Sequence, residues 1–178
     1  MNALRKKLEE SEGRVVCVEF GAYCGYSGIL MASEFQKFAV AFPGKVEPVL
    51  FSCDPSPVAG AVAARLILHA GVQNYVKQVY KKSSDFIEEL AVEGTKIDFL
   101  FLDHLKDLYL PDLQKVMELK LLNPGAVIVA DNCKYPGTPD YNHFVLNHPK
   151  LKTVVNETFL EYSQTIEDQV LVSQYSEK

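Results

Sequence analysis

The sequence predicts an α/β fold in which a doubly wound, mostly parallel sheet of seven strands carries helices on both faces. Three observations predict it. Short apolar runs with the length of strands alternate along the chain with segments that have a helical apolar period. Two of these runs, residues 97–102 and 126–130, are apolar almost throughout, as strands buried on both faces of a parallel sheet are. The last two strand-like runs are joined by a short turn, which predicts an antiparallel hairpin and hence one antiparallel edge strand.

The first half of the chain is expected to form a short helix followed by three strand–helix units. Leu4 and Leu8 are spaced i, i+4 within residues 2–11, and Gly13 is expected to cap this amphipathic helix. Ser83 or Ser84 is expected to cap a later helix. The predicted strands are residues 15–20, 47–53 and 75–79. Three helices are predicted after them: the first begins near Ser27, the second runs from Pro57 to about His69, and the third covers residues 85–90.

The second half of the chain is expected to complete the sheet. The predicted strands are residues 97–102, 126–130, 153–158 and 169–174, with helices at 110–119 and 141–147, a Pro/Gly loop at 133–140 and a turn at 165–168. Strands that alternate with helices imply right-handed crossovers, so the expected fold is Rossmann-like. Because the chain has 178 residues and contains no repeat, low-complexity tract or linker, residues 1–178 are expected to form a single domain.

Composition narrows the class of protein. The net charge of −5 and the pI near 5.4 give no support to a nucleic-acid partner, so small or neutral substrates are favoured. No run reaches the ~20 apolar residues of a membrane-spanning helix, and the charged N-terminus lacks the apolar core of a signal peptide. The four cysteines show neither C-x-x-C pairs nor zinc spacing, which favours reduced thiols. We therefore expect a cytoplasmic protein with no membrane partner.

Carboxylates follow two of the buried strands directly. Asp103 comes after residues 97–102, and Asp131 comes after residues 126–130 and is followed by Asn132. If the two strands are neighbours, the carboxylates lie about 5 Å apart and raise each other's pKa unless a cation sits between them. A set of three oxygen ligands without thiolate or imidazole favours Mg²⁺ over zinc. The alternative is that Asp131 and Asn132 form a polar turn while Asp103 caps a helix.

Lys106 lies three residues beyond Asp103. Beside a Mg²⁺ ion and partly buried, its amine is a candidate general base for a substrate hydroxyl that the metal also acidifies. The alternative is an ordinary solvated surface lysine, which is the usual environment of this residue type.

A glycine-punctuated loop follows the first predicted strand. Its pattern, Gly21-x-x-x-Gly25-x-x-Gly28, departs from the dinucleotide fingerprint because Tyr23 stands where the second glycine is required. Glu19 also places negative charge where a pyrophosphate would bind, which disfavours NAD and FAD. An adenosyl group that carries a sulfonium and an amino group suits an acidic site better. Asp54, at the end of the second strand, can hold two ribose hydroxyls, or it can merely begin an Asp-Pro turn. Together these residues favour S-adenosylmethionine.

Five stretches of the sequence resemble the motifs of the catechol O-methyltransferase family. They are residues 19–27 (EFGAYCGYS), 101–111 (FLDHLKDLYLP), 130–132 (ADN), 136–140 (PGTPD) and 159–162 (FLEY). The similarity runs in order from about Val15 to the end of the chain. The resemblance implies a class I S-adenosylmethionine-dependent methyltransferase. Its reaction would be Mg²⁺-dependent methyl transfer to one hydroxyl of a catechol-type substrate by direct in-line displacement.

The resemblance also implies roles for individual residues. Asp103, Asp131 and Asn132 match the Mg²⁺ ligands, and Lys106 matches the general base. Glu161 matches the acid that holds the second catechol hydroxyl, and the other positions near the substrate are those of Asn132, Pro136 and Tyr162. The positions that match cofactor contacts are Glu19, Gly21, Tyr23, Ser27, Asp54, Ser83, Ser84, Asp103 and His104.

The sequence departs from the family pattern in two places. Leu105 replaces a tryptophan between the histidine and the lysine, and the chain has no tryptophan at all. The family also carries further helices before its first strand, whereas only residues 1–14 precede that strand here. The competing interpretation is therefore a non-catalytic or weakly active S-adenosylmethionine-binding paralogue that lacks the N-terminal lid helices. A third interpretation is a dehydrogenase. A monomer is favoured.

Overall fold

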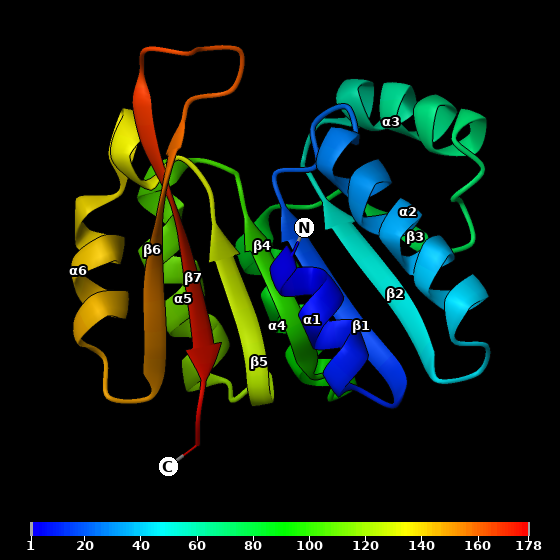
Figure 1. Ribbon diagram of the computed structural model, residues 1–178, viewed down its shortest axis with the longest axis horizontal. Coiled ribbons are helices and arrows are strands. Elements are labelled where there is room, and N and C mark those ends of the chain that lie inside the picture. Colours follow the sequence, from blue (N-terminus) through cyan, green and yellow to red (C-terminus); the bar gives the residue numbers. More distant parts are fainter. Residues whose placement is uncertain (1, 178) are drawn as a thin grey trace.

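A computed structural model describes residues 2–177 and shows one seven-stranded sheet with helices on both faces (Figure 1). The strand order is β3-β2-β1-β4-β5-β7-β6. The strands are β1 (Gly13–Phe20), β2 (Val46–Cys53), β3 (Val76–Val79), β4 (Ile97–Leu102), β5 (Leu122–Ala130), β6 (Leu151–Phe159) and β7 (Glu167–Tyr175). The helices are α1 (Asn2–Glu10), α2 (Tyr26–Ala41), α3 (Pro57–His69), α4 (Ser83–Glu93), α5 (Tyr109–Glu118) and α6 (Pro139–Asn147). The predicted Rossmann-like, doubly wound fold is confirmed.

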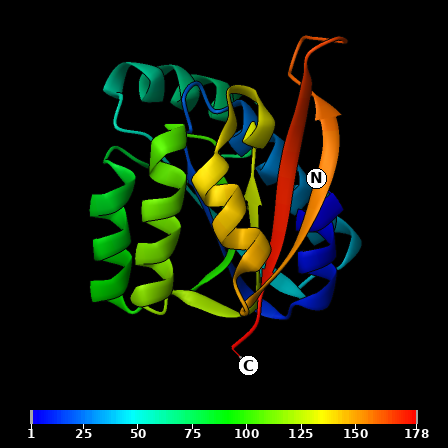
Figure 2. The same cartoon turned by 90° about the vertical axis from the view of Figure 1, so that its left-hand side faces the viewer.

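Two hydrophobic cores lie on opposite faces of the sheet. Side chains of α4, α5 and α6 pack with Val18, Leu100 and Ile128 on one face, and Figure 2 shows these three helices as one layer. Side chains of α1, α2 and α3 pack with Cys17 and Leu50 on the other face. Within residues 2–177, no helix covers the part of this second face that β6 and β7 form (Figure 1). One side of the sheet is therefore open at that edge.

The pairing of the strands brings distant parts of the sequence together. β1 pairs in parallel with β2 and with β4, and β4 pairs in parallel with β5. β7 runs antiparallel to both of its neighbours, so the predicted edge hairpin is confirmed, with β6 as the outermost strand and β7 one place in. The chain reverses over residues 160–166 rather than at 165–168, since Leu160 N donates to Ile166 O at 2.8 Å and Asp168 already lies in β7.

Two predicted helix caps are wrong. Gly13 begins β1 instead of capping α1, because its N–H donates to Lys45 O at 2.9 Å beside β2. Neither Ser83 nor Ser84 caps α4, which already begins at Ser83 and has Lys82 as its N-cap residue without a side-chain bond. At Gly13 the local sequence suggested a cap, and a backbone hydrogen bond to a distant residue makes it part of β1 instead.

The cysteines and the helix lengths bear on where such a protein could work. All four cysteines are free thiols, three of them buried. Among the helices of residues 2–177, none combines the length and apolar character that crossing a membrane requires.

Candidate active site

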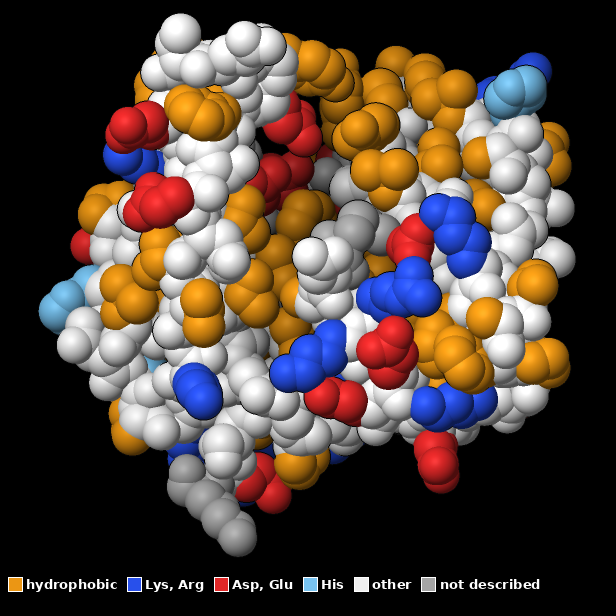
Figure 3. All heavy atoms as spheres, viewed as in Figure 1, with side chains coloured by type: hydrophobic (Ala, Val, Ile, Leu, Met, Phe, Trp, Pro, Cys, Tyr) orange, Lys and Arg blue, Asp and Glu red, His pale blue; other side chains and the backbone are white. Residues whose placement is uncertain are grey.

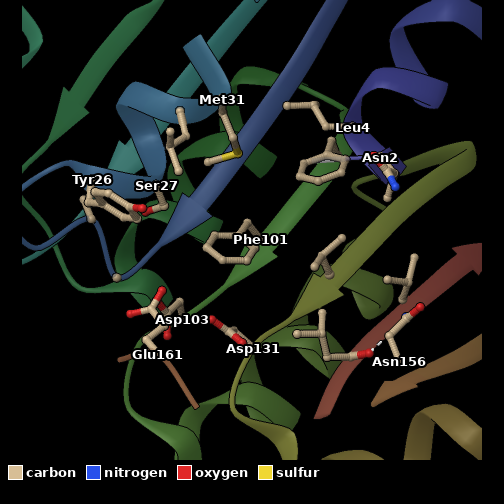
Figure 4. A pocket seen from close by; sticks show the side chains of 18 of the residues that line it. Asn2, Leu4, Tyr26, Ser27, Met31, Phe101, Asp103, Asp131, Asn156 and Glu161 are labelled. Atoms are coloured by element: carbon tan, nitrogen blue, oxygen red, sulfur yellow. Dashed lines mark hydrogen bonds between the residues drawn. The ribbon is translucent and has the colours of Figure 1, made fainter. Parts of the chain in front are cut away.

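A cavity of about 930 Å³ opens at the carboxyl ends of β1, β4 and β5. β1 and β4 are neighbours although β2 and β3 lie on the other side of β1, so this is the point at which the strand order reverses and where such sheets bind ligands. Figure 3 shows the hollow in the surface, with acidic side chains within it. Figure 4 shows Asp103, Asp131 and Glu161 at one end of the cavity, and Leu4, Asn2 and Asn156 at the other.

The glycine loop after β1 forms one wall of this cavity. Gly21 has a φ of +99°, and a Cβ at this position would overlap the carbonyl oxygen of Asp103, so only glycine allows the close approach. Tyr23 N donates to the Asp54 carboxylate at 3.0 Å, and the other oxygen of Asp54 accepts from Ser56 N at 2.8 Å. Asp54 thus both begins the Asp-Pro turn and fixes the glycine loop to the end of β2.

Glu19 lies behind this loop and is fully buried. Its carboxylate accepts hydrogen bonds from the hydroxyls of Ser52, at 2.6 Å, and of Ser27. Burial raises the pKa of Glu19 to about 6 even though the two hydroxyls lower it. Ser27 lines the cavity and Glu19 does not, so Glu19 acts on the cavity through the Ser27 hydroxyl and through its charge.

Glu19→Gln is expected to raise the free energy of unfolding by about 1–2 kcal/mol near neutral pH. The folded protein binds the Glu19 proton more tightly than the unfolded chain does, with a pKa of about 6 against 4.5. The parent protein therefore loses stability as the pH rises between these values, and the neutral amide does not. Urea denaturation at about pH 4 and about pH 8 measures the difference. Glu118→Gln, at an exposed position on α5, is the control. A Glu19→Gln effect of the same size at both pH values would contradict this expectation.

The ends of β4 and β5 carry four polar side chains, those of Asp103, Lys106, Asp131 and Asn132. The register pairs Leu102 with Ala130, so the following residues, Asp103 and Asp131, occupy neighbouring positions as predicted. The Lys106 ammonium donates to Asp103 Oδ1 at 3.1 Å and to Asn132 Oδ1 at 3.0 Å. Burial raises the pKa of both Asp103 and Asp131, and the charge of Asp103 raises that of Asp131 further.

This cluster has the donor chemistry of a Mg²⁺ site. A cation, the Lys106 ammonium, already contacts two of the three candidate ligand oxygens, and all three are oxygens. Within residues 2–177, no group of three or more Asp, Glu, His or Cys side chains is arranged to hold a metal. A metal site here would therefore use two carboxylates and one amide, a set that fits Mg²⁺.

Comparison with known proteins identifies the family. Residues 18–133 match the family model described as a methyltransferase domain. The chain is 36% identical over 154 residues to catechol O-methyltransferase of Bos taurus, covering 85% of this chain and 53% of that protein. It is 35% identical over 154 residues to catechol O-methyltransferase of Sus scrofa, covering 85% of this chain and 78% of that protein. The chain belongs to the catechol O-methyltransferase family.

Solved structures support the same fold. An O-methyltransferase from Bacillus cereus, in complex with SAH, aligns with a TM-score of 0.75 at 17% identity, over 97% of this chain and 79% of that one. The chain thus spans about half the length of the bovine catechol O-methyltransferase and most of the length of this structural neighbour.

Not all the residues predicted from the resemblance to catechol O-methyltransferases line the cavity. Those that do are Gly21, Tyr23, Ser27, Asp103, Asp131, Glu161 and Tyr162. Lys106 and Asn132 do not line the cavity, but Lys106 Nζ contacts Asp103, which does, and Asn132. The other predicted residues lie outside the lining, and they are Glu19, Asp54, Ser83, Ser84, His104 and Pro136.

His104 is held away from the cavity by its own contacts. Its Nε2 lies 2.9 Å from Asp112 Oδ2, and its ring stacks on Tyr109 with the centroids 5.1 Å apart. Its Nδ1 is buried and has no hydrogen-bond partner among the described residues. Ser83 and Ser84 lie in the first turn of α4, where the Ser84 carbonyl accepts from Lys115 Nζ at 3.1 Å.

Two residues that the sequence did not single out hydrogen-bond to the candidate site residues of this catechol O-methyltransferase family member. The Tyr109 hydroxyl accepts from Lys106 Nζ at 2.6 Å and donates to the Asp131 carbonyl at 3.1 Å. Asp168, which is buried at the start of β7, accepts from Asn132 Nδ2 at 2.9 Å. Tyr109 could have been suspected from its i, i+3 spacing to Lys106, whereas nothing local marks Asp168.

Proposed function

We propose that this chain transfers a methyl group from S-adenosylmethionine to one hydroxyl of a catechol-type substrate, with Mg²⁺ held by Asp103, Asp131 and Asn132. The observation that carries the proposal is the oxygen cluster beside the glycine loop, in which the Lys106 ammonium already bridges Asp103 and Asn132. The family of the chain and the names of its relatives support the reaction class.

The glycine-loop side of the cavity is the proposed place of the cofactor. Gly21 and Tyr23 give backbone access, and the Ser27 hydroxyl, fixed by Glu19, lines the wall. Each Asp54 oxygen accepts one backbone N–H, so each keeps a lone pair for a ribose hydroxyl. The negative charges of Asp103 and Asp54 near Glu19 favour a cofactor with a sulfonium and an amino group over a pyrophosphate. Ser83, Ser84 and His104, which match cofactor contacts of the family, are proposed to contact it as well.

The oxygen cluster is the proposed place of the catechol. Bound Mg²⁺ would orient the two hydroxyls and make the reacting one more acidic. Lys106 Nζ, once it has given up its own proton, takes the proton of that hydroxyl. Glu161, which lies at the same end of the cavity as Asp103 and Asp131, holds the second hydroxyl. The deprotonated oxygen then forms a bond to the methyl carbon of S-adenosylmethionine while the bond between that carbon and the sulfur breaks. The electron pair of the broken bond stays on the sulfur, which leaves S-adenosylhomocysteine. Pro136 and Tyr162 are proposed to contact the ring.

The deciding experiment is transfer of labelled methyl from S-adenosylmethionine to catechol, with Mg²⁺ present and then with EDTA. We expect turnover that EDTA abolishes and that added Mg²⁺ restores. Turnover that EDTA leaves unchanged would contradict the metal assignment. The matched control is the same assay with phenol, which lacks the second hydroxyl for Glu161 and the metal and is expected to react far more slowly.

A second candidate function is cofactor binding without turnover. It is favoured by the sheet face over β6 and β7, which no helix of residues 2–177 covers. Calorimetric titration with S-adenosylmethionine separates the two functions. Binding of the cofactor together with no methyl transfer to catechol would support the second, and binding together with metal-dependent transfer would support the first.

A further inference from the structure

We propose that Asp168 is a positioning residue that orients the Asn132 amide and holds the turn after it, so that Asn132 Oδ1 faces Asp103 and Lys106. The inference rests on the proposed function, since it concerns a proposed Mg²⁺ ligand. It goes beyond that function because it assigns a role to a residue that touches neither the proposed metal nor the substrate.

The carboxylate of Asp168 is saturated by hydrogen bonds. The side chain is 1% exposed, and it projects from the start of β7 toward the turn of residues 133–137. Its Oδ2 accepts from Asn132 Nδ2 at 2.9 Å. Its Oδ1 accepts from three backbone N–H groups, those of Lys134 at 3.1 Å, Tyr135 at 3.0 Å and Gln169 at 2.7 Å. One buried carboxylate therefore joins a strand, a turn and a side chain.

The bond to Asn132 determines which end of the amide faces the site. An amide nitrogen only donates and an amide oxygen only accepts, so the two ends are not interchangeable. Because Asp168 accepts from Nδ2, the oxygen must point the other way, where it lies 3.0 Å from Lys106 Nζ. If the amide were reversed, its NH₂ group would face the cation and no ligand oxygen would be presented.

The bonds to the turn hold the backbone that carries this amide. Asn132 has a φ of +55°, in the left-handed region that residues other than glycine adopt at some cost in energy. The Asp168 carboxylate accepts from the N–H groups of Lys134 and Tyr135, two and three residues after Asn132, so the unusual backbone is fixed from β7. The next residue is Pro136, which is proposed to lie near the substrate. Asp168 thus ties the metal side of the site to the substrate side.

Asp168→Asn is expected to lower the Mg²⁺ affinity of the protein about 10- to 100-fold, the usual effect of losing a group that orients a metal ligand. The variant replaces one acceptor oxygen with an NH₂ group, which must face either the Asn132 amide or the turn. The readout is the affinity for Mn²⁺ by electron paramagnetic resonance and for Mg²⁺ by calorimetry. The NMR signals of the Lys134 and Tyr135 amides in metal-free protein are expected to move. The affinity for S-adenosylmethionine is expected to stay within about twofold.

Two further variants make the test specific. Glu167 is the exposed neighbour of Asp168, and its carboxylate pairs with Lys134 Nζ at 2.5 Å. Glu167→Gln is expected to leave the Mg²⁺ affinity unchanged. Asp168→Ser replaces Asp168→Asn if that variant does not fold. Its short hydroxyl can still accept from a backbone N–H, but it cannot reach the Asn132 amide.

The outcomes distinguish this inference from the proposed function. Metal binding by the parent protein that Asp168→Asn or Asp168→Ser leaves intact would overturn the positioning role alone. Failure of the parent protein to bind Mg²⁺ or Mn²⁺ would overturn the proposed metal site and the inference with it. In an Asn132→Ala background, Asp168→Asn is expected to have no further effect on metal affinity, because the amide through which it acts is gone.

Discussion

Lys106→Met is expected to lower kcat for methyl transfer by roughly two to four orders of magnitude, the usual contribution of a general base. In the structure its ammonium donates to Asp103, Asn132 and Tyr109, so it lies where a hydroxyl between the metal ligands would release its proton. Methionine keeps much of the length and apolar stem of lysine but cannot accept a proton. Steady-state kinetics with catechol measure the effect, and the KM for S-adenosylmethionine is expected to change little.

Two control variants separate the base from the charge. Lys106→Arg keeps the positive charge beside Asp103 but supplies no base at neutral pH, so it is expected to be nearly as inactive as Lys106→Met. Lys37→Met, at an exposed position on α2, is expected to keep full activity. Substantial activity in Lys106→Arg would show that the charge of Lys106 matters more than its basicity.

Gly21→Ala is expected to destabilise the protein by about 3–5 kcal/mol. The residue has a φ of +99°, and an added methyl group would overlap the backbone of Asp103 and His104. The overlap cannot be relieved by moving a flexible side chain, because the obstacle is the backbone at the end of β4. Urea denaturation followed by circular dichroism measures the loss.

Gly94→Ala is the matched control for this variant. Gly94 also has a positive φ, +67°, but an added Cβ meets nothing within 4 Å. It is therefore expected to lose only about 1 kcal/mol, from the backbone conformation alone. Equal losses in the two variants would show that the close approach of Gly21 to Asp103 contributes nothing.

The strand ends were predictable because they follow from simple rules. Apolar runs that end in Asp103 and Asp131 are visible in the sequence, and in an alternating α/β chain such strands lie side by side with their carboxyl ends together. The register of β4 and β5 confirms that these positions are neighbours. The roles assigned to the residues still come from the resemblance and remain proposals.

Other parts of the site depend on contacts that the sequence does not show. Glu19 was expected to contact the cofactor, but β1 is buried on both faces, so its side chain lies inside the protein and is bonded to Ser27, which lines the cavity. Asp168 and Asn132 are 36 residues apart and meet only because β7 lies next to β5. No period or spacing in the sequence indicates such a pair.

The place of β7 between β5 and β6 has a consequence for the way the protein folds. β6 is synthesised before β7, yet within residues 2–177 it pairs with no strand except β7, so it cannot join the sheet until the later strand has been inserted. The carboxylate of Asp168 arrives with that same strand. The elements around the glycine loop, β1 to β4 with their helices, can therefore assemble earlier. The Asn132 side of the cavity is completed only when β7 pairs with β5. During synthesis, the chain would therefore form the proposed cofactor site before it completes the proposed metal site.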